Sequence, residues 1–136
     1  MDHAKLWNSL LELGFPSHIV YLLKNFYDDQ RATVRTEHGC TEEFGIGKGV
    51  RQGCILSPML FNMYGEMIMR EAGLDTMSEG IRIGGSQINN LRYADDTTLV
   101  SAYEDGLRRI FKSVQEASAR YGFQLNFSKT KIQRLI

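Results

Sequence analysis

The sequence of 136 residues is poor in the residues that cross-link a protein or anchor it in a membrane. Its two cysteines, Cys40 and Cys54, are not spaced as metal ligands and are too few for a disulfide framework. No apolar run approaches the roughly twenty residues that cross a bilayer, and the first residues lack the apolar core of a signal peptide. We therefore expect a soluble, intracellular protein that binds no membrane; the sequence does not distinguish the nucleus from the cytoplasm.

Net charge is also absent, because 16 basic residues balance 16 acidic ones. The balance is uneven along the chain, since residues 104–136 hold seven basic and three acidic residues whereas residues 1–103 hold nine and thirteen. The basic end could therefore face phosphate. A solvated helix face is the simpler interpretation for most of its basic residues, which are Arg108, Arg109, Lys112, Arg120 and Arg134.

Periodic apolar residues predict one domain that begins with two helices. A chain of this length can bury one core but not two. Leu6, Leu10 and Leu13 share one helical face. A second helix is expected to begin at Pro16 and Ser17. The apolar face of this second helix is predicted to contain Ile19, Leu22, Leu23 and Phe26.

The middle of the chain predicts a hairpin and then a third helix. Two β-prone runs that flank His38-Gly39 indicate a hairpin over residues 31–47. Ser57 is expected to cap the third helix, with Pro58 in the first helical position. A stripe of apolar residues predicts that this helix belongs to the core. The stripe contains Leu60, Tyr64, Met67 and Ile68.

The second half of the chain predicts strands on both sides of a helix. Asp105 is expected to cap the most amphipathic helix of the chain, which ends at Gly122. Alternating apolar residues predict the strands. Together, these elements predict an α+β fold in which helices cover one side of an antiparallel sheet. The predicted strands cover residues 81–83, 87–101, 123–127 and 132–136.

Two adjacent acids, Asp95 and Asp96, interrupt the second of these strands and fall at the tip of a predicted hairpin. A solvated turn is the plain alternative, and a second pair, Asp28-Asp29, ends a predicted helix without any evident chemistry. Neighbouring carboxylates repel each other, so a turn between strands favours such a pair where a cation neutralises it. Their oxygen atoms suit magnesium, and two ions about 4 Å apart would support nucleotidyl transfer.

Three segments in order resemble consecutive motifs of reverse transcriptases, in particular those of non-LTR (LINE-type) retrotransposons. The segments are GVRQGCILSP at residues 49–58, LRYADD at residues 91–96 and GFQLNFSKTK at residues 122–131. The leading DHAKLW at residues 2–7 also looks like the family segment that follows the first catalytic motif. The resemblance therefore covers nearly the whole chain.

The resemblance implies a metal site at the acid pair. Asp95 and Asp96 match the metal-binding acids of the family's Tyr-Ala-Asp-Asp motif, and Tyr93 matches the residue that backs this hairpin near the primer end. The implied cofactor is magnesium, with manganese as an alternative. This agrees with the chemistry expected of the two carboxylates themselves.

The resemblance also implies two contacts with the nucleotide. Arg51, Gln52 and Gly53 match part of the pocket for the incoming nucleotide, although a tight loop that leads into a helix explains the same residues. Lys129 matches a lysine near the pyrophosphate leaving group, where an ammonium could neutralise charge or donate a proton. A solvated lysine is the alternative, and Lys131 could share either role.

The implied fold is the palm of a right-hand polymerase, an antiparallel sheet that carries the acid hairpin. Residues 1–48 would connect the fingers and the palm, and residues 49–136 would form the palm. The fingers would be partial and the thumb absent. The implied activity is RNA-directed DNA synthesis, with an RNA template, a DNA primer and deoxynucleoside triphosphates as partners beside the rest of a parent polyprotein.

Two other interpretations remain open. A non-catalytic remnant or interaction module could keep the same fold. A nucleotidyl cyclase shares a palm-like sheet and metal-binding acids, but the Arg-Gln-Gly and Lys-Thr-Lys segments fit a polymerase better. We also expect the isolated chain not to polymerise, because the resembled family has a further catalytic aspartate a few residues before the segment that Asp2-His3 matches.

Overall fold

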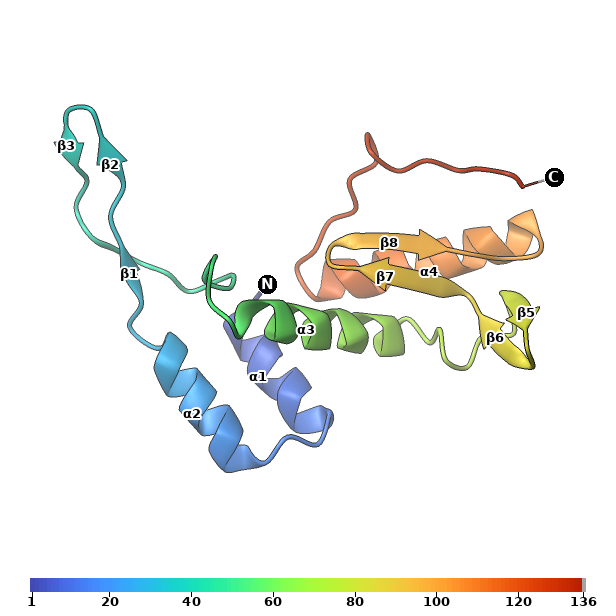
Figure 1. Cartoon of the computed structure of the whole chain (residues 1–136), viewed down its shortest axis with the longest axis horizontal. Helices are drawn as coiled ribbons and strands as arrows, with labels where there is room; N and C mark the ends of the chain where they lie inside the picture. The colour runs from blue at the N-terminus through green and yellow to red at the C-terminus, as the bar shows by residue number, and fades with distance from the viewer. Residues whose placement is uncertain (136) are drawn as a thin grey trace. The chain divides into compact units, whose positions relative to one another are not determined.

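Figure 1 shows the computed structural model of the chain, which describes residues 1–135. Within these residues the chain forms four helices and eight short strands, and all strand pairs are antiparallel. This mixture confirms the predicted α+β class. The chain divides into two compact units, Met1–Met67 and Ile68–Ile136. No helix in the described part is both long enough and apolar enough to cross a bilayer.

The first unit opens with helix α1, His3–Glu12. Asp2 caps this helix, because its carboxylate accepts a hydrogen bond from the backbone N–H of Lys5 at 3.1 Å. The same hydrogen bond lowers the pKa of Asp2 below its ordinary value. Leu6 and Leu10 are fully buried, as the sequence predicts.

Helix α2, Ser17–Tyr27, follows where it is predicted and contacts α1. The prediction of its apolar face is wrong, because three residues of that face are exposed in the structure. Ile19, Leu22 and Phe26 are 37%, 61% and 50% exposed. The helix is apolar on two sides, and a ring contact between Tyr27 and Trp7 of α1, with centroids 5.7 Å apart, selects the side that is buried. The buried residues of α2 are Val20 and Tyr27.

A long hairpin follows α2 and confirms the hairpin predicted over residues 31–47. Its turn lies at Glu37-His38, one residue before the predicted position, because Gly39 pairs with Thr36 inside the ladder. The four strands are short and form two separate pairs along the hairpin. Strand β1 (Arg31–Ala32) pairs with β4 (Phe44–Gly45), and β2 (Arg35–Thr36) pairs with β3 (Gly39–Cys40).

Helix α3, Ser57–Glu71, begins in the first unit and ends in the second. The prediction that Ser57 is the N-cap is wrong, because Ser57 is already the first helical residue. Its hydroxyl donates to the carbonyl oxygen of Arg51 at 2.6 Å, in the preceding loop, whereas the side chain of an N-cap residue accepts a hydrogen bond from an N–H of the first turn. The predicted apolar stripe is confirmed, since every member is at most 7% exposed. These residues are Leu60, Tyr64, Met67 and Ile68.

The second unit contains two successive hairpins. Asn89, which links them, is only 7% exposed, and its side-chain amide donates to the carbonyl oxygen of Leu74 at 2.7 Å. The described strands form four separate two-stranded sheets rather than one continuous sheet, because each strand pairs only with its hairpin partner. In this unit β5 (Ile81–Ile83) pairs with β6 (Ser86–Ile88), and β7 (Asn90–Tyr93) pairs with β8 (Asp96–Leu99).

Helix α4, Glu104–Arg120, contacts β8 and buries Ile110 and Val114. The cap prediction is wrong, because Asp105 lies inside the first turn and Tyr103 occupies the N-cap position without a side-chain hydrogen bond. The acids in this first turn still face the positive end of the helix dipole and stabilise it.

An ion pair holds α4 to the segment before β5. The guanidinium Nε of Arg109 donates to a carboxylate oxygen of Glu79 at 2.7 Å, and the Glu79 side chain is only 16% exposed. This hydrogen bond lowers the pKa of Glu79 below its ordinary value. The contribution of the pair to stability is therefore present at neutral pH and is lost as the pH falls through the lowered pKa.

The strands predicted after α4 are wrong within the described residues. Residues 123–127 are irregular, and so are residues 131–135; Ile136, the last residue of the predicted final strand, lies outside the described residues. A strand needs a neighbour to pair its N–H and C=O groups, and no described strand lies beside either segment. Phe123 instead donates its N–H to the carbonyl oxygen of Ser118 at 2.8 Å, and this hydrogen bond closes the end of α4 after Gly122 with its φ of +76°.

The close approach of Gly80 to the end of the β5–β6 hairpin predicts that an added methyl group at Gly80 has a large effect on stability. Gly80 has a φ of +138°, and a Cβ at this position would lie 2.6 Å from the carbonyl oxygen of Ile88. We expect Gly80→Ala to lower the free energy of unfolding by about 2 to 4 kcal/mol, measured by urea denaturation.

Gly65→Ala is the matched control for this substitution. Gly65 lies in α3, and a Cβ there meets no atom within 4 Å. Because alanine favours a helix over glycine, Gly65→Ala should raise the free energy of unfolding by up to about 1 kcal/mol. Equal effects of the two substitutions would contradict the packing described for Gly80.

Candidate active site

The predicted acid pair lies at the end of the β7–β8 hairpin (Figure 1). Tyr93 and Asp96 form the last residue pair of the ladder, and Ala94 and Asp95 form the two-residue turn between them. Asp95 is therefore the turn residue, and Asp96 is the first residue of β8. The ladder fixes the direction in which both acids leave the hairpin.

Ala94 adopts an unusual backbone conformation in this turn, with a φ of +51°. A residue with a Cβ atom pays roughly 1 kcal/mol or more in this left-handed region. The ladder on both sides imposes the conformation, because Tyr93 and Asp96 can pair only if the chain reverses within two residues. Strained residues of this kind are common at functional sites, and this one directly precedes Asp95.

Neither acid of the pair is neutralised by the protein. Both Asp95 and Asp96 are exposed, and among the described residues neither carboxylate forms a hydrogen bond or an ion pair. The second acid pair differs in this respect, since Asp29 forms an ion pair with Arg31 at 3.3 Å beside the end of α2. Of these two pairs in the described residues, the hairpin pair thus presents two free, adjacent carboxylates.

The chemistry of these carboxylates fits a divalent cation. Hard oxygen ligands that are free and exposed suit magnesium, which binds one or two carboxylates and takes its remaining ligands from water and phosphate. Within residues 1–135, no group of three or more His, Cys, Asp or Glu side chains is placed to hold a metal ion. Asp95 and Asp96 therefore offer a partial ligand set that a phosphate-bearing substrate can complete.

The predicted nucleotide-binding residues form an exposed loop before α3 in the first unit. The side chains of Arg51 and Gln52 are exposed and make no hydrogen bond or ion pair in the described part of the chain. Gly53 has a φ of +80°, so a side chain there would be strained. The carbonyl oxygen of Arg51 accepts two hydrogen bonds, from the N–H of Cys54 and the hydroxyl of Ser57. The loop backbone is thus held while its side chains are free.

Lys129 lies in a turn that sequence analysis did not foresee. Asn126 organises this turn, because its side-chain oxygen accepts from the Ser128 hydroxyl at 2.7 Å and its carbonyl oxygen accepts from the N–H groups of Lys129 and Thr130. Asparagine favours turns because its side chain can hydrogen-bond to a residue two positions later, as Asn126 does with Ser128, so the sequence contained the information. The Lys129 side chain is exposed, and within the described residues no hydrogen bond or ion pair joins it to Asp95 or Asp96.

The predicted site residues are therefore divided between the two compact units. One hairpin of the second unit contains Tyr93, Asp95 and Asp96. Lys129 belongs to the same unit but lies outside this hairpin. The Arg51-Gln52-Gly53 loop belongs to the first unit. Tyr93 is 84% exposed, so its ring is free for contact with another molecule.

The basic face of α4 is largely neutralised by the protein itself. Arg108 pairs with Glu104 four residues earlier, and this contact raises the pKa of Arg108. Exposed pairs of this kind contribute little stability, but they leave less free charge for phosphate. The interpretation of this face as solvated is supported. The remaining pairs are Arg109–Glu79 at 2.7 Å, Lys112–Glu116 at 3.9 Å and Arg120–Glu71 at 3.2 Å.

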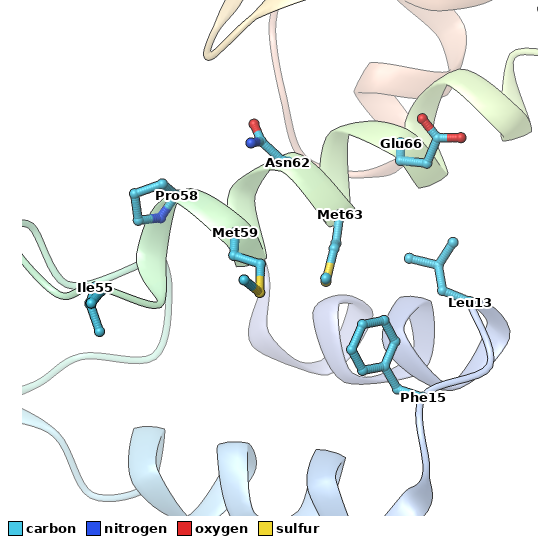
Figure 2. A pocket seen from close by; sticks show the side chains of 8 residues that line it. All are labelled: Leu13, Phe15, Ile55, Pro58, Met59, Asn62, Met63 and Glu66. Carbon is cyan, nitrogen blue, oxygen red and sulfur yellow. The ribbon is translucent and has the colours of Figure 1, made fainter.

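An apolar groove of about 620 Å³ lies in the first unit (Figure 2). Side chains from the N-terminal half of α3 form one side, and Leu13 and Phe15 from the α1–α2 connection face them. None of the predicted site residues lines this groove. The α3 residues that line it are Pro58, Met59, Asn62, Met63 and Glu66.

Comparison with known proteins decides the family of the chain. The family described as reverse transcriptase (RNA-dependent DNA polymerase) matches residues 1–134. The chain belongs to the reverse transcriptase family. This confirms the resemblance on which the sequence analysis relied, and it favours a polymerase over the nucleotidyl cyclase that was also considered.

This reverse transcriptase domain is similar to proteins of retrotransposable elements and to a transposon protein. It is 27% identical over 129 residues to the Pol polyprotein of the retrotransposable element R2DM of Drosophila melanogaster, covering 95% of the chain and 12% of that protein. It is 31% identical over 125 residues to the R2 Pol polyprotein of Nasonia vitripennis, covering 92% of the chain and 12% of that protein. A transposon TX1 protein of Xenopus laevis is 29% identical over 135 residues, covering 96% of the chain and 10% of that protein.

The reverse transcriptase domain therefore spans between 10% and 12% of the length of these relatives. Members of the family are RNA-directed DNA polymerases, that is, nucleotidyltransferases, and they use divalent metal ions. The predicted non-LTR retrotransposon origin agrees with the R2 relatives.

The conformation of Ala94 generates a stability prediction for the reverse transcriptase hairpin. Replacing alanine with glycine removes the steric cost of a Cβ at positive φ, which is about 1 to 2 kcal/mol. Glycine also makes the unfolded chain more flexible, which lowers the stability of the folded state by about 0.5 to 1 kcal/mol. We expect Ala94→Gly to leave the free energy of unfolding unchanged or to raise it by up to about 1 kcal/mol. Ala119→Gly, at an exposed position of α4, should lower it by about 1 kcal/mol. If urea denaturation shows that both substitutions lower the free energy of unfolding equally, Ala94 is not strained.

Proposed function

We propose that this chain carries metal-binding and nucleotide-binding residues of a polymerase that copies RNA into DNA. The observation that carries the proposal is the exposed, unneutralised pair Asp95-Asp96 at the end of a hairpin, in a chain of the reverse transcriptase family. In this reaction the 3′-hydroxyl of a DNA primer attacks the α-phosphorus of a deoxynucleoside triphosphate. The bond to the bridging oxygen of the β-phosphate breaks, and pyrophosphate leaves.

Asp95 and Asp96 hold the divalent ions in this proposal, with magnesium as the first candidate and manganese as the alternative. When bound, these ions supply the positive charge that activates the attacking hydroxyl and stabilises the leaving oxygen. The exposure of both carboxylates supports this role, because phosphate oxygens of a nucleotide can reach the same ions. The rigid ladder below the turn keeps the two carboxylates in place.

The nucleotide and the primer are held by three further groups of residues. Arg51, Gln52 and Gly53 form part of the pocket for the incoming nucleotide, where the free guanidinium can bind phosphate. The exposed ring of Tyr93 lies behind the acid hairpin, close to the primer end. Lys129 supplies an ammonium group that neutralises or protonates the leaving pyrophosphate.

The partners follow from this chemistry. The substrates are an RNA template, a DNA primer and deoxynucleoside triphosphates, and the chain acts together with the rest of a parent polyprotein inside the cell. Residues 1–48 connect the fingers and the palm, and residues 49–136 form the palm. The family match over residues 1–134 and the R2 relatives support this assignment.

Loss of the acid pair tests the proposal. In a full-length polymerase that contains this chain, Asp95→Asn should slow primer extension on an RNA template by about a hundred- to thousandfold, because charge that stabilises the transition state is lost. The same substitution in the chain itself should weaken manganese binding, measured by titration calorimetry.

Asp28→Asn is the control, since it changes the other acid pair of the chain. It should leave both primer extension and manganese binding unchanged. Equal losses in the two variants would refute the assignment of Asp95. Metal binding without any nucleotide addition by the full-length protein would instead favour the non-catalytic interaction module.

The role of Lys129 predicts a separation of rate from affinity. If Lys129 assists the leaving group, Lys129→Ala should lower kcat for nucleotide addition about a hundredfold and change KM for the nucleotide little, because only transition-state stabilisation is lost. Lys112→Ala, which removes an exposed lysine that pairs with Glu116, should change neither constant. An unchanged kcat in Lys129→Ala would return Lys129 to the solvated surface.

A further inference from the structure

One backbone atom of Arg51 holds the end of the Arg51-Gln52-Gly53 loop that is nearer to α3. The carbonyl oxygen of Arg51 accepts the hydroxyl of Ser57 at 2.6 Å and the N–H of Cys54 at 3.2 Å. The Ser57 contact is the shorter of the two, and Ser57 is only 6% exposed. A hydroxyl that is buried and aimed at a carbonyl is costly to leave unpaired, so this contact fixes the carbonyl direction.

Tyr27 completes this contact from α2. The single hydroxyl hydrogen of Ser57 is used on Arg51, so the hydroxyl oxygen of Ser57 can only accept from Tyr27, whose hydroxyl lies 3.5 Å away. Tyr27 is 3% exposed. The chain of groups therefore runs in one direction, from the Tyr27 hydroxyl to Ser57 and from Ser57 to the carbonyl oxygen of Arg51.

The other end of the loop is held through the same tyrosine ring. The His3 ring lies 5.4 Å from the Tyr27 ring in an edge-to-face arrangement, and its Nε2 lies 2.7 Å from the carbonyl oxygen of Gly49. Because a carbonyl oxygen only accepts, Nε2 carries the hydrogen. Tyr27 thus contacts the groups that hold both Gly49 and Arg51.

The fixed carbonyl has a consequence for Gln52. No peptide bond in the described chain is cis, and in a planar trans peptide the carbonyl oxygen of Arg51 and the N–H of Gln52 point in opposite directions. When Ser57 holds the oxygen, the N–H of Gln52 points away from Ser57. This N–H donates to no group in the described residues, so it is free to donate to an oxygen of a bound nucleotide.

We infer that Tyr27 and Ser57 are positioning residues, which orient the Arg51–Gln52 peptide so that its free N–H and the flanking side chains can bind a deoxynucleoside triphosphate. This inference rests on the proposed function. Neither residue touches the nucleotide; both act through the carbonyl oxygen of Arg51.

Amide hydrogen exchange of the chain tests the positioning without any nucleotide. The N–H of Cys54 reports on the loop, because it donates to the same carbonyl oxygen. In Ser57→Ala its exchange should accelerate by about tenfold, and in Tyr27→Phe by about threefold, consistent with the loss of one hydrogen bond. The N–H of Leu60, which donates to Leu56 within the start of α3, should keep its exchange rate.

Tyr21→Phe is the matched control, since Tyr21 lies on the same helix and is 63% exposed. It should leave Cys54 exchange unchanged. Tyr27→Phe keeps the ring that contacts His3 and Trp7, so it separates the hydroxyl from the packing. Faster exchange throughout residues 1–67 in both variants would overturn the inference, because the residues would then serve general stability.

Nucleotide kinetics of a full-length polymerase that contains this chain give the second readout. Ser57→Ala and Tyr27→Phe should raise KM for the deoxynucleoside triphosphate by about three- to tenfold and change kcat by less than about twofold, since only uniform binding is lost. A fall in kcat at constant KM would overturn the inference. If the unaltered polymerase incorporates no nucleotide, the proposed function fails, and faster Cys54 exchange alone would still support the hydrogen-bonded chain from Tyr27 to Arg51.

Discussion

The antiparallel pairing of β7 with β8 is the interaction on which the acid pair depends. This ladder places Asp95 in the turn and Asp96 at the start of β8, next to Ala94 with its φ of +51°. Contacts at the base of the hairpin support the ladder. Asn89 is anchored to Leu74 and accepts the N–H of Val100 at 2.8 Å, and α4 contacts β8. The hydrogen bonds and packing at the base of the hairpin therefore support the exposed tip, which carries Asp95 and Asp96.

The loop before α3 is built by a different principle. The acids of the hairpin are placed by neighbours in sequence, whereas Arg51 is placed by Ser57 and, through it, by Tyr27, which lies on another helix. Long-range contacts of this kind bind the loop to the packing of α1 and α2. A substitution in the helical part of the first unit can therefore change a loop that lies far from it in sequence.

Local patterns in the sequence predicted what depends on local contacts. Apolar periodicity located all four helices, and the acid pair was correctly expected beside a hairpin turn. The errors share a cause, which is that the deciding contact cannot be read from the local pattern of residue types. The face of α2 is chosen by Trp7, the hydroxyl of Ser57 is taken by a carbonyl six residues earlier, and residues 123–127 alternate like a strand but have no strand beside them. In the candidate site, residue types could be predicted, but the strain at Ala94 and the contacts of the Arg51 carbonyl could not.

The division of the described strands into four two-stranded hairpins affects how the chain folds. Each hairpin closes a short stretch of chain, so its contacts are local and cost little loop entropy, which favours rapid folding. An isolated two-stranded hairpin is only marginally stable, however, and gains its persistence from what packs on it. The β2–β3 pair, whose residues are all exposed, should open independently of the rest, whereas β8 of the acid hairpin also contacts α4. The acid hairpin therefore has a packing partner that the hairpin after α2 lacks among the described elements.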